Sequence, residues 1–194
     1  LINLAAYTDV EKAENDFDNA RKINALAVRS FANALKANGG HIIQISTDYV
    51  FKGDQNSPYK IFHKRDPLGI YGQTKYEAET FLEEILINTN QFTIIRTSWL
   101  VGPWRNNFVK TILKKLSEPE DQECLKIVSD QIGCITTTKS IVKIILLLIN
   151  KKLNDENLPS HLHWCSSGKA SWYQIASSIK KISQELNFVK SIRV

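Results

Sequence analysis

The chain of 194 residues contains only eight glycines, no methionine and three cysteines. No glycines stand in the close, regular spacing that lets a loop bind phosphate at a helix N-terminus, so this stretch carries no phosphate-binding loop of that kind. The cysteines are odd in number and form no C-x-x-C pair, which argues against a disulfide framework. Reduced thiols in a cytoplasmic protein are the simplest interpretation.

Long hydrophobic runs are also absent. The longest, Ile144–Ile149, is far too short to cross a bilayer, and it is flanked by Lys143 and Lys151. No basic segment followed by an apolar one opens the chain, so we expect no signal peptide. The first residues, Leu1–Ala6, already read as a core strand, and together with the missing methionine they indicate a piece of a longer protein.

The composition is that of an ordinary globular protein, with 43% apolar and 23% charged residues. A chain of this length can form one core, or a core and a small lobe. The net charge of +5 is spread over scattered lysines and arginines. This favours a solvated basic surface, with attraction for phosphorylated small molecules as the functional alternative, and we expect no nucleic-acid partner.

Short apolar runs alternate with helical patterns, which predicts an α/β domain with a mainly parallel sheet. The predicted strands are Leu1–Ala6, Ile42–Ile45, Phe92–Ile95 and Leu125–Val128. Helices are predicted at about 16–38, with Phe17 and Ile23 on its inner stripe, at 70–87, from Phe108 onward, at 138–153, and at 172–186 after a Ser171 cap. Residues 48–68 form a long loop beyond a strand end, where such folds bind ligands. We expect residues 1–101 to form the main domain and 102–194 mainly a smaller lobe.

Tyr71 and Lys75 lie one helical turn apart, on the same face of the second predicted helix. An ammonium there can lower the pKa of a phenol toward the range that proton transfer at neutral pH requires, and can bond the hydroxyls of a ribose. Thr47 directly follows an apolar strand, so its hydroxyl can reach a substrate carbonyl at the strand end. Together the three predict carbonyl reduction. Each has a plain alternative: a surface Tyr–Lys pair, and a turn cap at Thr47.

Other candidates are weaker. Asp48 could accept a hydrogen bond from a sugar hydroxyl or simply close a turn. The small residues of Ala5-Ala6-Tyr7 would let a flat ligand approach the backbone, although they also suit tight packing. Trp99 could stack on a base or sugar ring, but a lone Trp is more often core. His161 and His163 could share a face, yet no third ligand is evident and we assign no metal.

Seven ordered motifs resemble the dTDP-4-dehydrorhamnose reductases, which are extended short-chain dehydrogenases of dTDP-L-rhamnose synthesis. They are Asn3–Val10, Ser46–Phe51, Tyr71–Lys75, Arg96–Trp99, Asn106–Phe108, Asp130–Gly133 and Ser171–Tyr173. The resemblance implies a Rossmann-like doubly wound parallel sheet, truncated at its N-terminus, with a smaller α/β substrate-binding lobe. The glycine-rich loop would lie in the missing part.

The resemblance also implies site roles and partners. Tyr71 would be the proton donor, Lys75 would orient the cofactor and Tyr71, and Thr47 would assist at the keto oxygen. The cofactor, NADPH or NADH, would be lined by Ala5, Ala6, Tyr7, Tyr71 and Lys75. The dTDP-sugar substrate would face Thr47, Asp48 and Trp99. We expect no membrane partner, and a homodimer is one possible assembly.

Two departures and two alternatives accompany this resemblance. Gly69 stands where the family usually has Asn, and Ile135 where it usually has Pro, which puts local loop geometry in question. Another sugar-nucleotide epimerase or dehydratase of the superfamily is the first alternative, against which the Thr47–Trp99 combination argues. The second is a non-catalytic homologue resembling the regulatory β subunit of methionine adenosyltransferase, and Arg96–Trp99 favours the reductase over it.

Overall fold

The computed structural model describes residues 1–117 and 125–188, which fall into two compact units. The first unit comprises Leu1–Thr97 together with Ile144–Trp164, and the second comprises Ser98–Lys143 together with Cys165 onward. The chain therefore leaves the first unit after β3 and returns to it within a later helix. The assignment of residues 1–101 to a cofactor domain and of 102–194 to a substrate lobe stays a prediction.

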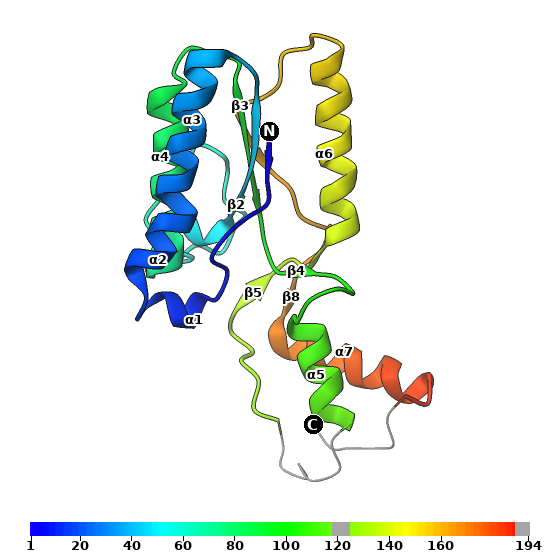
Figure 1. Cartoon of the computed structure of the whole chain (residues 1–194). Coiled ribbons are helices and arrows are strands. Elements are labelled where there is room, and N and C mark those ends of the chain that lie inside the picture. Colours follow the sequence, from blue (N-terminus) through cyan, green and yellow to red (C-terminus); the bar gives the residue numbers. More distant parts are fainter. Residues whose placement is uncertain (118–124, 189–194) are drawn as a thin grey trace. The chain divides into compact units, whose positions relative to one another are not determined.

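A four-stranded parallel sheet forms the centre of the first unit (Figure 1). Its order is β1 (Ile2–Asn3), β2 (Ile42–Thr47), β3 (Phe92–Thr97) and β7 (His161–His163). Thr47 pairs with Thr97 in the β2–β3 register, so both strands end at one level. The predicted α/β class with a parallel sheet is confirmed, but β1 is shorter than expected, and just beyond it the Asn3 side chain accepts the Ala5 N–H.

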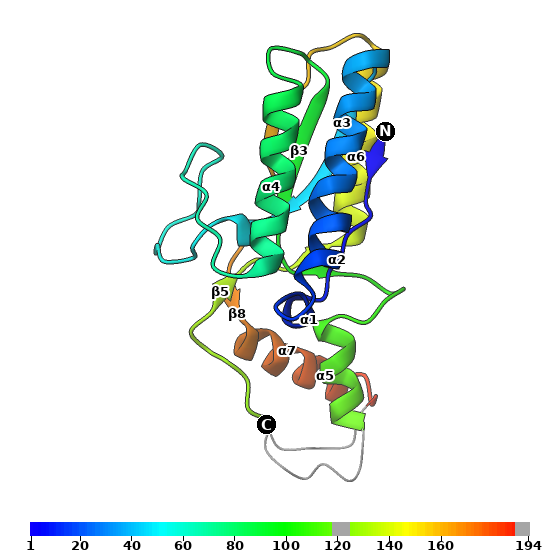
Figure 2. The ribbon, with the colours of Figure 1, turned by 60° about the vertical axis from the view of Figure 1, so that its left-hand side comes forward.

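Helices cover both faces of this sheet. On one face lie α3 (Ala27–Asn38) and α4 (Ile70–Ile85), and on the other lies the part of α6 (Thr138–Leu153) that belongs to this unit (Figures 1 and 2). Short elements complete it: α1 (Val10–Ala13), α2 (Phe17–Arg21), a π-helical turn η1 (Lys22–Leu26) and a 3₁₀ turn η2 (Asp48–Val50).

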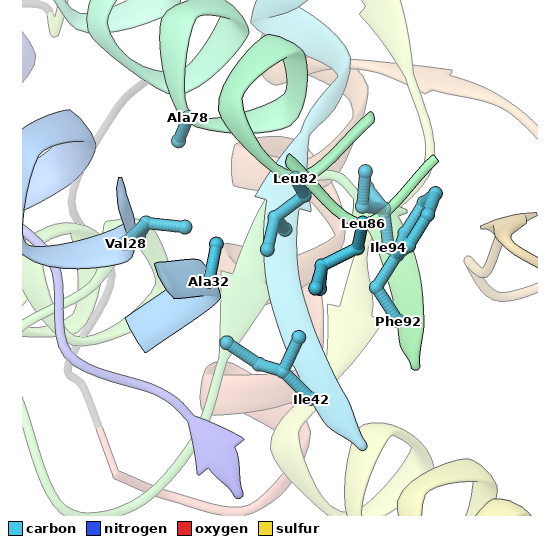
Figure 3. Close-up of a cluster of buried hydrophobic side chains, with 8 residues drawn as sticks. All are labelled: Val28, Ala32, Ile42, Ala78, Leu82, Leu86, Phe92 and Ile94. Atoms are coloured by element: carbon cyan, nitrogen blue, oxygen red, sulfur yellow. The ribbon is translucent and has the colours of Figure 1, made fainter. Parts of the chain in front are cut away.

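An apolar core joins α3 and α4 to the starts of β2 and β3 (Figure 3). The side chains of this core have almost no contact with solvent. They are those of Val28, Ala32, Ile42, Ala78, Leu82, Leu86, Phe92 and Ile94. Burial of such side chains is the main favourable contribution to folding, so this cluster fixes α4 on the sheet.

The π-turn η1 changes which residues of the predicted helix 16–38 face inward. A π-turn contains one extra residue per turn, so the 3.6-residue periodicity is interrupted there. As a result Ile23, expected on the inner stripe, is 43% exposed, whereas its neighbour Asn24 is 1% exposed. Phe17, also expected inside, is 44% exposed. The inner face predicted for this segment is therefore wrong at these positions.

The second unit is built from two small sheets and two helices. β4 (Leu100–Val101) runs parallel to β6 (Thr136–Thr137), and β5 (Ile132–Gly133) is antiparallel to β8 (Ala170–Ser171). α5 (Phe108–Ser117) and α7 (Trp172–Glu185) pack through Ile112, Leu116 and Ala176. Ser171 caps α7 as predicted, in a reciprocal capping box with Gln174.

The predicted strand at Leu125–Val128 is wrong, because these residues have no regular secondary structure. Val128 is 49% exposed, and its carbonyl accepts the Tyr173 N–H from α7 instead of pairing in a sheet. Cys124 lies outside the described residues, while the Cys134 thiol donates to the Gly168 carbonyl. Across residues 1–117 and 125–188, no helix is long and apolar enough to cross a membrane.

Candidate active site

The candidate site lies at the carboxyl end of β2, where the first turn of α4 approaches η2. Glu14 Oε1 accepts the Ile70 N–H at 2.8 Å and so caps α4. Gly69 leaves room for this carboxylate, since a Cβ there would stand 2.7 Å from Glu14 Oε1. Gly72 permits the close contact between α4 and η2, because a Cβ there would stand 2.3 Å from the Tyr49 carbonyl oxygen. These two glycines bring Tyr71 against the end of β2.

Tyr71 packs edge-on against Tyr49, with ring centroids 5.9 Å apart. Burial is the largest influence on its phenol and raises the pKa to about 12. An interaction with the Thr47 hydroxyl lowers this pKa, while the charge of Asp48 raises it further. The shift is opposite to the lowering expected from Lys75. The phenol of Tyr71 therefore holds its proton firmly at neutral pH.

Lys75 is 3% exposed, and its Nζ donates to the Ile45 carbonyl at 2.6 Å. Burial lowers the pKa of its ammonium to about 8, and the negative charge of Glu79 opposes that shift. The ammonium is therefore directed at the backbone of β2, which explains why it does not lower the pKa of Tyr71. At neutral pH Lys75 still carries its proton.

Thr47 and Asp48 form a turn at the end of β2. The Thr47 hydroxyl donates to Asp48 Oδ1 at 3.2 Å and accepts the Tyr49 N–H at 3.2 Å, so Thr47 caps η2. Burial raises the pKa of the Asp48 carboxyl to about 6, against the bonds from Thr47 and backbone N–H groups that lower it. Thr47 is thus a turn cap, which was the structural alternative for this residue. Its hydroxyl also interacts with Tyr71.

The Ala5-Ala6-Tyr7 segment follows β1 and is held by Asn24. Asn24 Oδ1 accepts the Tyr7 N–H at 2.8 Å, and Asn24 Nδ2 donates to the Tyr7 carbonyl at 3.2 Å and to Thr74 Oγ1 at 3.1 Å. The Tyr7 hydroxyl donates to Asp16 at 2.9 Å. Asn24 thus ties the Ala5–Tyr7 segment to α4. The sequence reasoning missed it because the π-turn hides its inward direction from a helical periodicity.

A buried charged cluster lies behind the site, and the sequence reasoning missed it as well. Glu79 has no solvent-exposed surface and binds Ser46 of β2, Arg96 of β3 and Arg65 of the preceding loop. His161 and His163 belong to its outer edge, where they bond Glu83 and the Tyr59 carbonyl. In the part of the chain that the structure describes, no three His, Cys, Asp or Glu side chains could hold a metal ion.

Trp99 belongs to the second unit. Its backbone has φ 45°, a region that bulky side chains rarely adopt, and its ring stacks on Trp172 with centroids 3.7 Å apart. Gly133 lets the indole lie against the backbone, because a Cβ there would stand 2.6 Å from a ring carbon. The same unit has a cavity of about 620 Å³ whose lining includes Phe108, Lys115, Lys126, Gln131 and Trp172.

Comparisons with known proteins agree on one family. The chain is 38% identical over 183 residues to the spore coat polysaccharide biosynthesis protein SpsK of Bacillus subtilis, which covers 94% of this chain and 60% of that protein. It is 34% identical over 179 residues to the dTDP-4-dehydrorhamnose reductase of Escherichia coli K12, covering 92% and 58%. The chain therefore spans about 60% of the length of these curated relatives.

Solved structures extend the likeness to the fold. The dTDP-4-dehydrorhamnose reductase of Bacillus anthracis, solved in complex with NADP, has a TM-score of 0.84 at 38% identity, covering 94% of this chain and 61% of that one. MoeE5, solved with UDP-glucose and NAD, has a TM-score of 0.76 at 17% identity and shares the fold. A family model described as the RmlD substrate binding domain matches residues 1–193, and the chain belongs to this family.

Proposed function

We propose that the protein containing this chain reduces the 4-keto group of dTDP-4-dehydro-L-rhamnose to dTDP-L-rhamnose, using NADPH or NADH. The observation that carries the proposal is the meeting of Tyr71, Thr47 and Lys75 at the carboxyl end of β2, in a chain whose relatives are named as reductases of this kind. Those names favour the reductase over the epimerase, dehydratase and non-catalytic alternatives. Reduced dinucleotides and reduced thiols both suit a cytoplasmic enzyme.

The residues present fit the reactive end of a dinucleotide. Among the described residues, Thr97 Oγ1 is one of two buried side-chain oxygens without a hydrogen-bond partner, and it lies at the end of β3 in register with Thr47. The ammonium of Lys75 has three N–H donors, of which one is directed at Ile45. Thr97 and Lys75 can thus take hydroxyl groups at this strand edge. Ala5 and Ala6 would line the same cofactor.

The bound dinucleotide would supply the hydride for reduction of the keto carbon. The chain itself would supply the proton, from Tyr71 Oη to the keto oxygen. The raised pKa of Tyr71 keeps that proton in place until negative charge develops on the oxygen. Thr47 would turn the hydroxyl proton that it donates to Asp48 toward the same oxygen. Lys75 would orient the cofactor next to Tyr71, through the donors of its ammonium that are not directed at Ile45.

The sugar nucleotide would need groups for a base and a diphosphate. The cavity of the second unit offers both kinds, since Trp172 and Phe108 provide aromatic surface and Lys115 and Lys126 provide ammonium groups. The lining of this cavity therefore suits a nucleotide. Trp99, stacked on Trp172, would support the aromatic wall.

The test is the oxidation of NADPH or NADH by the complete protein, followed with and without dTDP-4-dehydro-L-rhamnose. Tyr71→Phe removes only the phenolic hydroxyl and with it the proton, and we expect kcat to fall by about 10²–10⁴-fold. Tyr76→Phe is the matched control, because Tyr76 lies on the same helix with its ring under the Arg65 guanidinium at 4.5 Å. Unchanged turnover in folded Tyr71→Phe, or no oxidation by the wild type, would overturn the proposal.

A further inference from the structure

One row of α4 carries four ionisable side chains at intervals of four residues: Tyr71, Lys75, Glu79 and Glu83. Two of them hold successive residues of β2. Lys75 Nζ donates to the Ile45 carbonyl at 2.6 Å, and Glu79 Oε1 accepts from the Ser46 hydroxyl at 2.6 Å. The next residue of the strand is Thr47. The position of Thr47 therefore depends on two contacts that come from α4.

Glu79 is the negative centre of this arrangement. Arg96 donates to it from Nε at 2.9 Å and from Nη2 at 2.7 Å, and the Arg96 side chain is 3% exposed. Arg65 Nη1 donates to Glu79 Oε2 at 2.9 Å. Arg96 is also the β3 partner of Ser46 in the sheet register. One buried carboxylate thus faces two guanidinium groups and lies one helical turn from an ammonium.

The remaining charged and titratable groups lie farther along the cluster. Glu83 accepts from Arg65 at 2.7 Å and bonds His161 Nε2 at 2.9 Å. His163 bonds the Tyr59 carbonyl through Nδ1, while its Nε2 faces Arg96 at 3.3 Å. This pattern suits a neutral imidazole, in keeping with a pKa that burial and Arg96 lower. Among the residues that the structure describes, Glu79 alone places negative charge beside both Ser46 and Lys75.

We propose that Glu79 is a positioning residue of the reductase site, which fixes Thr47 through Ser46 and supplies the negative charge that keeps the Lys75 ammonium protonated. The inference rests on the proposed function for its catalytic meaning. Its electrostatic half rests on the geometry of the helix row, because Glu79 lies one turn from Lys75 on the same face of α4 and its negative charge acts on that ammonium. A buried ammonium that loses such a carboxylate neighbour gives up its proton more readily.

Glu79→Gln tests the electrostatic half, since it removes the charge and keeps the size. Burial already lowers the pKa of Lys75 to about 8. We expect Glu79→Gln to lower it further by about one to two pH units. The measurement is an NMR titration of the complete protein with isotope-labelled lysine, in which the Lys75 signal is identified by its absence in Lys75→Met. This titration needs neither substrate nor cofactor.

Glu83→Gln is the matched control, because it removes the same charge from the same helix row but touches neither Ser46 nor Lys75. We expect it to move the Lys75 titration by no more than a few tenths of a pH unit. An equal shift in both variants, or no shift in folded Glu79→Gln, would overturn the proposal. Should Glu79→Gln fail to fold, Arg65→Gln removes a positive neighbour of Glu79 and must shift the Lys75 titration upward.

Kinetics test the positioning half. Glu79→Asp keeps the charge but shortens the reach to Ser46, so we expect an unchanged Lys75 titration with a lower kcat and a little-changed KM. In Glu79→Gln the alkaline limb of the kcat profile should move to lower pH together with the Lys75 titration. A kcat profile that stays fixed while Lys75 shifts would refute the link to catalysis. Absence of wild-type turnover would instead refute the proposed function and leave the titration result intact.

Discussion

Two neighbouring rows of α4 are buried against the same sheet and have opposite chemistry. One row, with Ala78 and Leu82 and continued by Leu86 just after the helix, packs on the starts of β2 and β3 (Figure 3). The other, with Tyr71, Lys75 and Glu79, lies over the ends of β2 and β3. Because α4 runs opposite to the strands, its first turns meet the carboxyl edge, where ligands bind in parallel sheets.

The difference separates stability from chemistry within one helix. Apolar side chains gain free energy on burial without needing partners, whereas each buried charge must recover its desolvation cost from precise contacts. Lys75 shows the cost directly, since its pKa is lowered despite the nearby carboxylate. The apolar row should therefore carry the stability of the first unit, and the ionisable row should carry its activity at some expense of stability.

The largest effect should come from the apolar row. Leu82 is fully buried, and Leu82→Ala should lower the free energy of unfolding by about 2–5 kcal/mol through lost burial and a residual cavity. Urea unfolding of the complete protein measures this change. Leu153→Ala is the control, because Leu153 is 76% exposed, and it should stay within about 0.5 kcal/mol of the wild type. Turnover per folded molecule should be unchanged in Leu82→Ala. A loss of turnover would mean that the apolar row supports activity as well as stability.

The second-largest effect is expected for Lys75→Met, which should raise the free energy of unfolding instead of lowering it. The pKa of Lys75 is about 8 in the folded chain against 10.5 for the unperturbed group. The unfolded state therefore binds more protons between these values, so the wild type gains stability as the pH rises through that window. Below it, the buried charge costs roughly 3 kcal/mol. Allowing about 1 kcal/mol for the lost bond to Ile45, Lys75→Met should stabilise the protein by roughly 2 kcal/mol at neutral pH.

Lys75→Met should also abolish turnover, because the cofactor would lose the ammonium that orients it next to Tyr71. Its stability advantage should shrink as the pH rises above about 8, and Lys36→Met, at an exposed position, is the control for the loss of one lysine. Unfolding curves recorded from neutral to alkaline pH distinguish the two. A destabilised Lys75→Met would mean that the ionisable row supports the fold as the apolar row does.

The sequence predicted the residues whose positions follow from simple periodicity. Tyr71 and Lys75 share a face because they lie four residues apart, and Thr47 lies at a strand end because Ile42–Ile45 is a continuous apolar run. Asn24 could not be found this way, since a π-turn shifts the inward face by one residue. Glu79 and Arg96 were equally hidden, because a charged residue in a helix or strand reads as exposed unless its distant partner is known.

The smallest effect should come from Glu83, at the outer end of the ionisable row. Burial would raise the pKa of its carboxyl, but His161 and Arg65 outweigh it and lower the pKa to about 2 from 4.5. A carboxyl group whose pKa is lower in the folded than in the unfolded state stabilises the fold at pH values above its unfolded pKa. This stabilisation is lost as the pH falls toward the folded pKa. With partial solvent screening this amounts to roughly 1 kcal/mol at neutral pH.

Glu83→Gln should therefore be less stable than the wild type at neutral pH, and the gap should close as the pH falls from about 4.5 toward 2. Glu84→Gln, at the exposed neighbouring position, is the control for the loss of one carboxylate from this helix. A gap in Glu83→Gln that stays constant with pH would mean that the carboxylate acts by shape and not by charge. Of the two carboxylates in this row, only Glu79, which lies next to Lys75 and Ser46, would then act through its charge.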